Sequence, residues 1–232
     1  MLTNKRTLTL PCLVGLSILF ASCATESETA ASQPRTPTTV AGGAVRIDPG
    51  LPVILAFGDS LTAGHLVDTE ASYPSQLQNE LDRRGYHYRV VNQGISGDTT
   101  SGGRARLAGA LRLEPELVIL ELGGNDGLRG IPIEVARSNL ATMIEAFKEE
   151  GTLVVLAGLT LPRNYGPDYI SEFETMFVEL AEEYDTVRIP FFLEGVAGDR
   201  ELNLPDGIHP TGEGYAIVVE NVLETIETYL KK

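Results

Sequence analysis

The chain has 232 residues, of which 43% are hydrophobic and 22% are charged. This length can bury one sizeable core, and no second composition regime appears, so we expect a single catalytic-size domain. The formal net charge is -14, and because an acidic domain repels polyanions, we expect neither a nucleic-acid partner nor electrostatic adhesion to anionic lipid.

The first 22 residues have the pattern of a secretory signal. Two basic residues precede an apolar stretch over about 8–20, which is too short to span a bilayer comfortably, and small residues lead to Cys23. The ending FASC resembles a bacterial lipobox, whose cysteine is lipid-modified after cleavage. We therefore expect residues 1–22 to be a lipoprotein-type signal peptide and Cys23 to be lipidated; a simple signal peptide with an incidental cysteine is the alternative.

Residues 23–46 are rich in Thr, Ser, Ala, Pro and Gly and contain almost no large apolar side chain. Such a segment cannot bury enough surface to fold, so it reads as a flexible tether. Cys12 lies in the discarded signal, so no disulfide can form within the mature chain. Together these features predict an exported protein, a periplasmic or cell-envelope lipoprotein of a bacterium, whose domain at 47–232 is held to a membrane by a lipid anchor.

Short apolar runs alternate with segments of helical period throughout residues 47–232. The runs predict strands at 52–57, 88–93, 117–122, 152–158 and 186–192, and the helical patterns lie at 72–85, 102–113, 132–151, 171–184 and 213–230. Continuous β-branched strands separated by amphipathic helices indicate a parallel sheet covered on both faces. The sequence therefore predicts an α/β fold, a doubly wound three-layer α/β/α sandwich.

Ligands of such sheets bind beyond the carboxyl ends of the strands, where the winding reverses. The loops expected at that edge contain GDSLTAGH, GISGDTTSGG, GGNDGLRG, LTLPRNYGPDY and FLEGVAGDRELNLPDGIHPTGEG. Glycines and hydroxyl groups gather in these loops, whereas the turns at the opposite edge look like ordinary connectors. Function is expected at the first edge.

Ser60 and His209 are the candidate nucleophile and base. Among the three histidines of the chain, only His209 has a carboxylate on its own turn, Asp206, and a serine nucleophile needs a base that a third group orients. Alone, Ser60 reads as a helix cap and DGIHP as an Asp-Gly turn. Their coincidence on loops at one edge predicts a triad, and His65 and His87 are expected to be surface or packing residues.

Acyl transfer also needs donors for the oxyanion that forms on the substrate carbonyl. The backbone N–H groups of Ser60 and Gly94 and the side-chain amide of Asn125 are the candidates, each on a different loop. Gly123 and Gly124 are expected to free Asn125 from helix or strand geometry.

Other polar residues are expected to have structural roles. Asp59 is expected to hold the nucleophile loop, and Asp98 and Asp126 read as turn carboxylates. With few histidines and no usable cysteines, a transition-metal site has too few donors. FGDSLTAG lacks the glycine spacing of a dinucleotide or phosphate-loop fingerprint, so we expect no metal and no cofactor.

These blocks resemble a known family. GDS around Ser60, the glycine in NQGISGDT, GGND with Asn125, and DGIH with Asp206 and His209 match, in order, the blocks of SGNH (GDSL-type) hydrolases. The resemblance implies a flavodoxin-like, five-stranded parallel sheet, with Ser60 as nucleophile, His209 as base, Asp206 as its orienter, and Gly94 and Asn125 as oxyanion donors.

Longer strings, namely ISGDT, ELGGNDGLRG, LPRNYG, PFF and DGIHP, are similar to the bacterial branch of multifunctional acyl-CoA thioesterases, lysophospholipases and arylesterases. The resemblance implies that the segment with Leu161, Pro162, Asn164 and Tyr165 binds substrate and shapes acyl-chain selection. The lipobox-like leader and the tether are not part of this hydrolase pattern.

The leading interpretation is a serine esterase, expected to be monomeric, that acts on aryl esters, short to medium acyl esters and lysophospholipids. An acyl-CoA thioesterase uses the same site, although coenzyme A is not expected outside the cytoplasm, and a carbohydrate O-deacetylase needs a more open, polar cleft. A non-catalytic module could instead cradle a phosphate with Ser60 and Thr62. The DGIH pair disfavours that reading, because a phosphate cradle has no need of an Asp-oriented base.

Overall fold

The computed structural model describes residues 50–232, which belong to one compact unit. A five-stranded parallel sheet forms its centre, with the strand order β2-β1-β3-β4-β5. The strands are β1 (Val53–Gly58), β2 (Arg89–Gly94), β3 (Leu117–Glu121), β4 (Leu153–Ala157) and β5 (Val187–Ile189). The chain winds outward from β1 to β2 and then crosses back to β3, so the winding reverses between β1 and β3.

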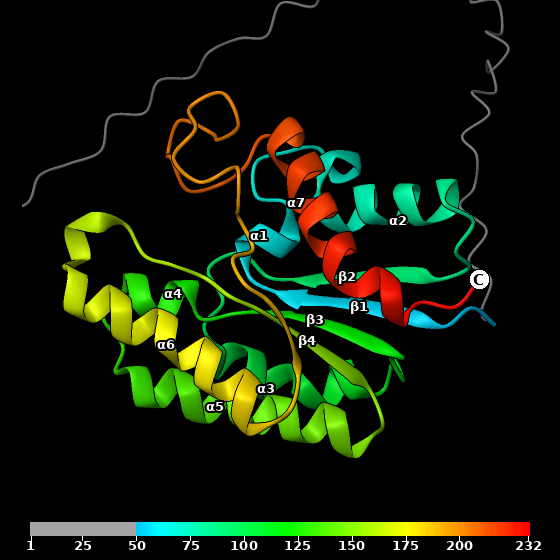
Figure 1. The fold of residues 1–232 in the computed structure, drawn as a ribbon, viewed down its shortest axis with the longest axis horizontal. Helices are drawn as coiled ribbons and strands as arrows, with labels where there is room; N and C mark the ends of the chain where they lie inside the picture. The colour runs from blue at the N-terminus through cyan, green and yellow to red at the C-terminus, as the bar shows by residue number, and fades with distance from the viewer. Residues whose placement is uncertain (1–49) are drawn as a thin grey trace, which may run out of the picture. The chain divides into compact units, whose positions relative to one another are not determined.

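Helices cover both faces of the sheet (Figure 1). On one face lie α2 (Tyr73–Arg83) and α7 (Gly212–Ile226); on the other lie α3 (Thr100–Leu111), α5 (Ile133–Glu149) and α6 (Pro167–Glu183). Two short helices, α1 (Ser60–Ala63) and α4 (Gly124–Leu128), follow β1 and β3, and single turns of 3-10 helix span Thr69–Ala71, Arg163–Tyr165 and Glu227–Tyr229. The predicted three-layer, doubly wound sandwich is confirmed.

The core is built on the two central strands. Every residue of β1 and β3 is buried, whereas the edge strand β2 is only partly buried. This difference follows from the sequence, because the uninterrupted apolar runs VILAF and LVIL can be covered by helices on both faces. The aromatic rings of Phe57 and Phe147 meet edge to face, 6.0 Å apart, and join β1 to α5.

Most predicted boundaries differ from the structure by a few residues, and two of the differences are caused by proline. The strand expected at 186–192 ends at Ile189, because Pro190 has no N–H to continue the ladder. The helix expected from residue 171 begins at Pro167, since proline is well suited to the first position of a helix.

The prediction that Gly123 and Gly124 keep Asn125 out of a helix is wrong. Gly123 has a φ of 118°, which ends the strand, and α4 begins at the next residue, so Asn125 lies in the first turn of a helix. The signal peptide, the lipidation site Cys23 and the tether all lie outside the described residues. Within residues 50–232, no helix has both the length and the hydropathy needed to cross a membrane.

Candidate active site

Ser60 lies at the point where β1 turns into α1, beside the reversal of the sheet. Asp59 caps this helix, and its carboxylate accepts a hydrogen bond from the Leu61 N–H at 3.1 Å. A Cβ at Gly58 would lie 2.1 Å from Thr62 Oγ1 and 2.5 Å from Glu121 Oε2. Only glycine therefore allows the strand to end this close to the helix, and the tight turn leaves Ser60 at the sheet edge.

The loop between β5 and α7 presents His209 and Asp206. Its base is closed by backbone hydrogen bonds from Leu204 N–H to the His209 carbonyl at 2.7 Å and from Thr211 N–H to the Leu202 carbonyl at 2.8 Å. Inside the loop, Asp206 Oδ1 accepts the backbone N–H of His209 at 3.0 Å. The backbone N–H of His209 therefore holds the Asp206 carboxylate in place, and the same carboxylate contacts the His209 ring.

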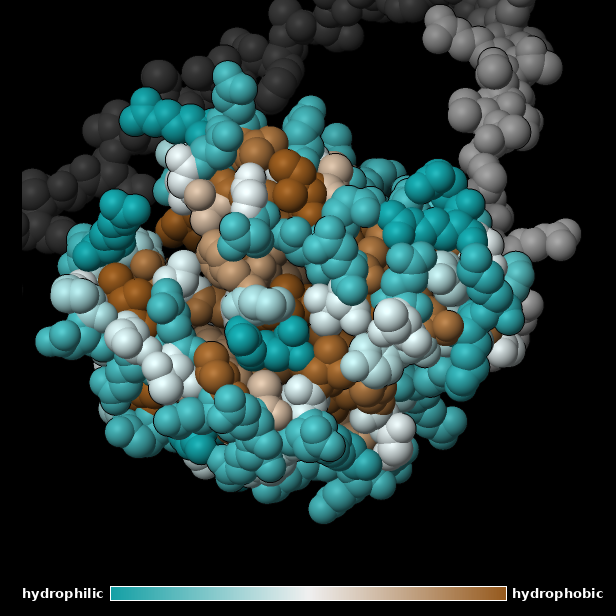
Figure 2. Space-filling model, viewed as in Figure 1, coloured by the Kyte–Doolittle hydropathy of each residue, from teal (hydrophilic) through white to brown (hydrophobic). Residues whose placement is uncertain are grey.

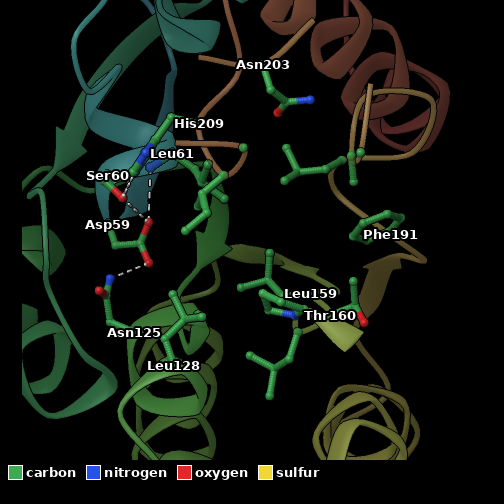
Figure 3. Close-up of a pocket in the computed structure, with 18 of the residues that line it drawn as sticks. Asp59, Ser60, Leu61, Asn125, Leu128, Leu159, Thr160, Phe191, Asn203 and His209 are labelled. Atoms are coloured by element: carbon green, nitrogen blue, oxygen red, sulfur yellow. Dashed lines mark hydrogen bonds between the residues drawn. The ribbon is translucent and has the colours of Figure 1, made fainter. Parts of the chain in front are cut away.

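The structure brings the three predicted triad residues together. His209 Nε2 lies 2.9 Å from Ser60 Oγ (Figure 3), and His209 Nδ1 lies 2.7 Å from Asp206 Oδ2. With Nδ1 protonated, the imidazole donates to Asp206 and leaves Nε2 free to accept the serine proton. This is the geometry that nucleophile, base and orienting group require.

Asp206 remains charged throughout the neutral range. Burial alone would raise its pKa, but hydrogen bonds from the His209 and Ile208 backbone and from the His209 ring outweigh burial and lower the pKa to about 2. The carboxylate is therefore present as an anion whenever His209 acts as a base.

Two of the predicted oxyanion donors lie in or beside the nucleophile turn. Ser60 is the first residue of α1, so its N–H has no acceptor within the helix. Asn125 Nδ2 donates to Asp59 Oδ2 at 2.9 Å, which orients the amide toward the nucleophile turn and leaves a second N–H on the same nitrogen (Figure 3).

Gly94, the third predicted donor, does not line the site cavity. Its N–H donates to Asn92 Oδ1 at 2.9 Å, and a Cβ there would lie 2.1 Å from the Ala63 nitrogen. Gly94 thus allows β2 to approach α1 closely. The same loop contributes Gly97 to the cavity wall instead, at a φ of 79°. The string ISGDT contains Gly97, but its spacing did not indicate whether Gly94 or Gly97 would line the cavity.

A cavity of about 1070 Å³ adjoins Ser60 and His209. In Figure 2 brown apolar surface gathers around the middle of this face, interrupted by a teal hydrophilic group near the centre. The cavity extends from the serine toward Leu159 and Phe191 (Figure 3). Its apolar wall includes Leu61, Leu128, Leu159, Leu161, Phe191 and Leu193. Such a lining accommodates a hydrocarbon chain beside the reacting carbonyl.

The predicted substrate-binding segment is only partly in the cavity wall. Leu161 and Pro162 line the cavity, and so does Arg163, which the prediction omitted. Asn164 is exposed and is not among the lining residues. Tyr165 instead donates its hydroxyl to the Leu128 carbonyl at 2.8 Å and so ties this segment to the end of α4.

His65 was expected to be a surface or packing residue, but it belongs to the site wall. It lines the cavity, its ring centroid lies 4.7 Å from that of His209, and its Nδ1 lies 3.4 Å from Ser96 Oγ. His87 is exposed at the opposite edge, as expected. Nothing in the sequence indicated that His65 would lie against His209, because only the fold brings the two loops together.

The other carboxylates hold neighbouring elements. Asp126 is fully buried and accepts the Thr100 N–H at 2.8 Å and the Thr100 hydroxyl at 2.6 Å, so it fixes the start of α3 rather than forming an open turn. Asp98 pairs with Arg106 at 2.8 Å. Across residues 50–232, no group of three or more His, Cys, Asp or Glu side chains is arranged to hold a metal ion.

A nucleophile turn at the switch point of a parallel sheet, with an oriented histidine and an apolar cavity, is an arrangement suited to the hydrolysis of ester bonds. A sequence model of the GDSL-like Lipase/Acylhydrolase family matches residues 56–217, and the chain belongs to this family. The resemblance read from the sequence blocks is thereby confirmed, and so is the assignment to enzymes that hydrolyse ester bonds.

Similar proteins support this membership. Esterase TesA of Pseudomonas aeruginosa is 45% identical over 178 residues, which cover 76% of this chain and 89% of the relative. Thioesterase 1/protease 1/lysophospholipase L1 of Escherichia coli K12 is 35% identical over 168 residues, covering 72% and 79%. The crystal structure of TesA superposes with a TM-score of 0.74 at 44% identity, covering 76% of this chain and 98% of that one.

Proposed function

We propose that this chain is an exported serine esterase that cleaves carboxylic esters through a Ser60–His209–Asp206 triad and a covalent acyl-enzyme. One observation carries the proposal: the hydrogen-bonded series from Ser60 Oγ to His209 Nε2 at 2.9 Å and from His209 Nδ1 to Asp206 Oδ2 at 2.7 Å, placed at the mouth of an apolar cavity.

In the first half-reaction, His209 Nε2 takes the proton of Ser60 Oγ while the oxygen attacks the ester carbonyl. The oxyanion is held by the Ser60 N–H, the Asn125 amide and, in place of Gly94, the Gly97 N–H. The intermediate then expels the alcohol, which takes the proton from His209. Asp206 stabilises the imidazolium between these two transfers.

In the second half-reaction, water attacks the acyl-enzyme. His209 accepts a proton from the water, the same donors hold the new oxyanion, and the acid leaves as Ser60 regains its hydrogen. No external cofactor is needed, because both proton transfers use the same imidazole.

The cavity supports substrates with an apolar acyl group, namely aryl esters, short to medium acyl esters and lysophospholipids. Its volume of about 1070 Å³ exceeds what an acetyl group fills, and most of its surface is apolar, although Arg163 and Glu174 also line it. The name of the Escherichia coli relative includes lysophospholipase, which agrees with this class.

Acyl-CoA thioester hydrolysis is the second candidate. The same oxyanion donors serve a thioester, and the name of the Escherichia coli relative includes thioesterase. A carbohydrate O-deacetylase fits less well, because a sugar ester needs polar walls. A phosphate-binding module fits least, because it leaves the pairing of His209 with Asp206 without a purpose.

Export and anchoring rest on the sequence. We propose that the signal at 1–22 directs export and that Cys23 carries the lipid. The tether at 23–46 then links the lipidated cysteine to a hydrolase domain at 47–232. This domain acts as a monomer in the periplasm or cell envelope. Because the net charge of the chain is -14, electrostatic attraction to anionic lipid would not hold it at a membrane, whereas a lipid on Cys23 would.

Covalent trapping tests the proposal. A fluorophosphonate should label the wild-type protein at one site, mapped to Ser60 by mass spectrometry, and should not label Ser60→Ala. A series of p-nitrophenyl esters of increasing acyl length should then give the highest kcat/KM beyond acetate. Absence of labelling, or labelling that survives in Ser60→Ala, would overturn the nucleophile assignment.

A further inference from the structure

Directly behind the nucleophile turn lies a carboxyl group that the triad does not use. Glu121 is the last residue of β3, pairs in register with Gly58 of β1, and is fully buried. A buried acidic side chain is rare without a charged partner, and no salt bridge to Glu121 occurs among residues 50–232. Its position therefore requires an explanation.

One oxygen of this carboxyl holds both sides of the serine. Glu121 Oε2 accepts the Thr62 hydroxyl at 2.7 Å and the Asp59 backbone N–H at 3.3 Å. Asp59 precedes Ser60 and Thr62 follows two residues later, so the two contacts bracket the nucleophile. The close approach is possible only because Gly58 has no side chain to occupy the space.

We propose that Glu121 is a positioning residue for the nucleophile, which fixes the turn 59–62 from the neighbouring strand and thereby sets the approach of Ser60 Oγ to His209. This proposal rests on the triad assignment above. Glu121 touches neither the cavity nor His209, so it acts only through the turn.

The surroundings favour the neutral acid over the carboxylate. Burial, and then the charge of Asp59, raise the pKa of Glu121 well above its usual value. Its second oxygen, Oε1, is buried and has no hydrogen-bond partner among the described residues. An ionised carboxylate would keep the donors at Oε2 but would leave Oε1 without one, which is costly in the interior.

The groups that face Glu121 supply no positive charge. Tyr73 from α2 and Tyr215 from α7 are both fully buried, and burial together with the nearby Glu121 raises the pKa of each. The guanidinium of Arg106, from α3, donates to the Gly58 carbonyl and pairs with Asp98, not with Glu121.

Asp59 is the member of the acid pair that can bear the charge. Burial raises the pKa of Asp59 to about 6, while the Leu61 N–H and the Asn125 amide oppose that rise by donating to its carboxylate. We therefore expect the negative charge of the pair to lie on Asp59, which accepts the Asn125 amide, while Glu121 holds the turn as a neutral acceptor.

The test compares Glu121→Gln with Glu121→Leu. Glutamine is neutral and keeps an oxygen that can accept from Thr62 and Asp59, so kcat on p-nitrophenyl butyrate should stay within about threefold of the wild type. Leucine removes the acceptor, and kcat should fall by about 10- to 100-fold with little change in KM, since misplacement of a reacting group slows chemistry more than binding.

A second variant covers the case in which Glu121→Leu does not fold. Thr62→Val removes only the 2.7 Å hydrogen bond to Oε2, and its rate of labelling by a fluorophosphonate should fall by about 10-fold. Circular dichroism confirms that each variant is folded. Full activity in folded Thr62→Val and Glu121→Leu would overturn the positioning role.

Thermal unfolding tests the neutral form separately. A carboxyl group whose folded-state pKa is raised contributes stability that is present below its unfolded pKa and is lost as the pH rises through the folded value. Glu121→Gln removes this loss, so its Tm should match the wild type near pH 4, below the unfolded pKa of about 4.3, and exceed it near pH 8.5. A Tm advantage that is absent at pH 8.5, or a collapse of kcat in Glu121→Gln, would show that the charged form is needed.

Ser60→Ala separates this inference from the proposed function. If Ser60→Ala kept its activity, the triad assignment would be wrong. The kinetics of the Glu121 variants would then no longer be evidence that Glu121 positions the nucleophile. The pH dependence of Tm does not involve catalysis and would still test whether Glu121 is neutral.

Discussion

Ser60 owes its expected reactivity to groups that lie far from it in the chain. His209 is 149 residues away in sequence, yet its ring accepts the serine hydroxyl at 2.9 Å. Asp206, held at low pKa by the backbone of the same loop, keeps the imidazole in the required orientation. At this scale the site is a set of ordinary side chains whose orientations are fixed by hydrogen bonds.

Asn125 provides a prediction at the residue scale. Asn125→Ala should fold normally and lose about 10²- to 10³-fold in kcat with little change in KM, because its amide acts mainly on the oxyanion of the transition state. Steady-state kinetics on p-nitrophenyl butyrate measure both constants. An unchanged kcat would place Asn125 among the residues that only orient Asp59, to which its amide donates.

The residues of the site differed in how well the sequence predicted their roles. Ser60, His209 and Asp206 could be predicted because few residue types perform their chemistry and the loops that carry them end neighbouring strands. Glu121 and His65 could not, since an acid at the end of an apolar strand and a histidine in a glycine loop acquire their contacts only from tertiary packing.

Elements long enough to show a period were predicted, and shorter ones were not. The five strands follow from their apolar runs, and four of the five long helices follow from their amphipathic pattern; α3, rich in Gly and Ala, shows almost none. The two short helices α1 and α4 have four and five residues, too few for a period, and they form because a cap at Asp59 and the positive φ of Gly123 end the preceding strands.

Gly94 gives a prediction at the element scale. Gly94→Ala should lower the Tm by several degrees, because the new Cβ would lie 2.1 Å from the Ala63 nitrogen and push α1 away from β2. Activity should fall as well, since α1 begins with Ser60. Thermal unfolding followed by circular dichroism measures the change.

Gly109→Ala is the matched control. Gly109 lies inside α3, and a Cβ there meets only the end of the Arg112 side chain at 3.6 Å. Because alanine favours a helix over glycine by roughly 1 kcal/mol, this variant should keep or raise the Tm. Equal effects of the two substitutions would show that the contact between β2 and α1 is not tight.

At the scale of the whole molecule, the sheet brings distant loops to one edge. The reversal between β1 and β3 places the nucleophile turn beside α4, and the long excursion after β5 returns His209 to the same edge (Figure 1). A parallel sheet of this order therefore specifies where the site lies before any side chain is considered. The sequence pattern predicted that edge correctly, but it could not say which loop glycine would reach the cavity.

The membrane anchor is a prediction about the full chain. In bacteria that express the complete sequence, Cys23→Ser should move the protein from the membrane fraction to the soluble exported fraction, because the modified cysteine is lost. Labelling with a fatty-acid probe should disappear in the same variant. If the wild-type protein is never labelled, the prediction that FASC is a lipobox with a lipidated Cys23 is wrong.

The triad is tested most directly by the kinetics of Ser60→Ala, His209→Ala and their combination on one p-nitrophenyl ester. Because both residues act on the same proton transfer, each single variant should lose nearly all activity and the double variant should lose little more. Asp206→Ala should be milder, and His65→Ala should retain most of the activity. Losses that multiply in the double variant, or an inactive His65→Ala beside an active His209→Ala, would contradict the assignment of His209 as the base.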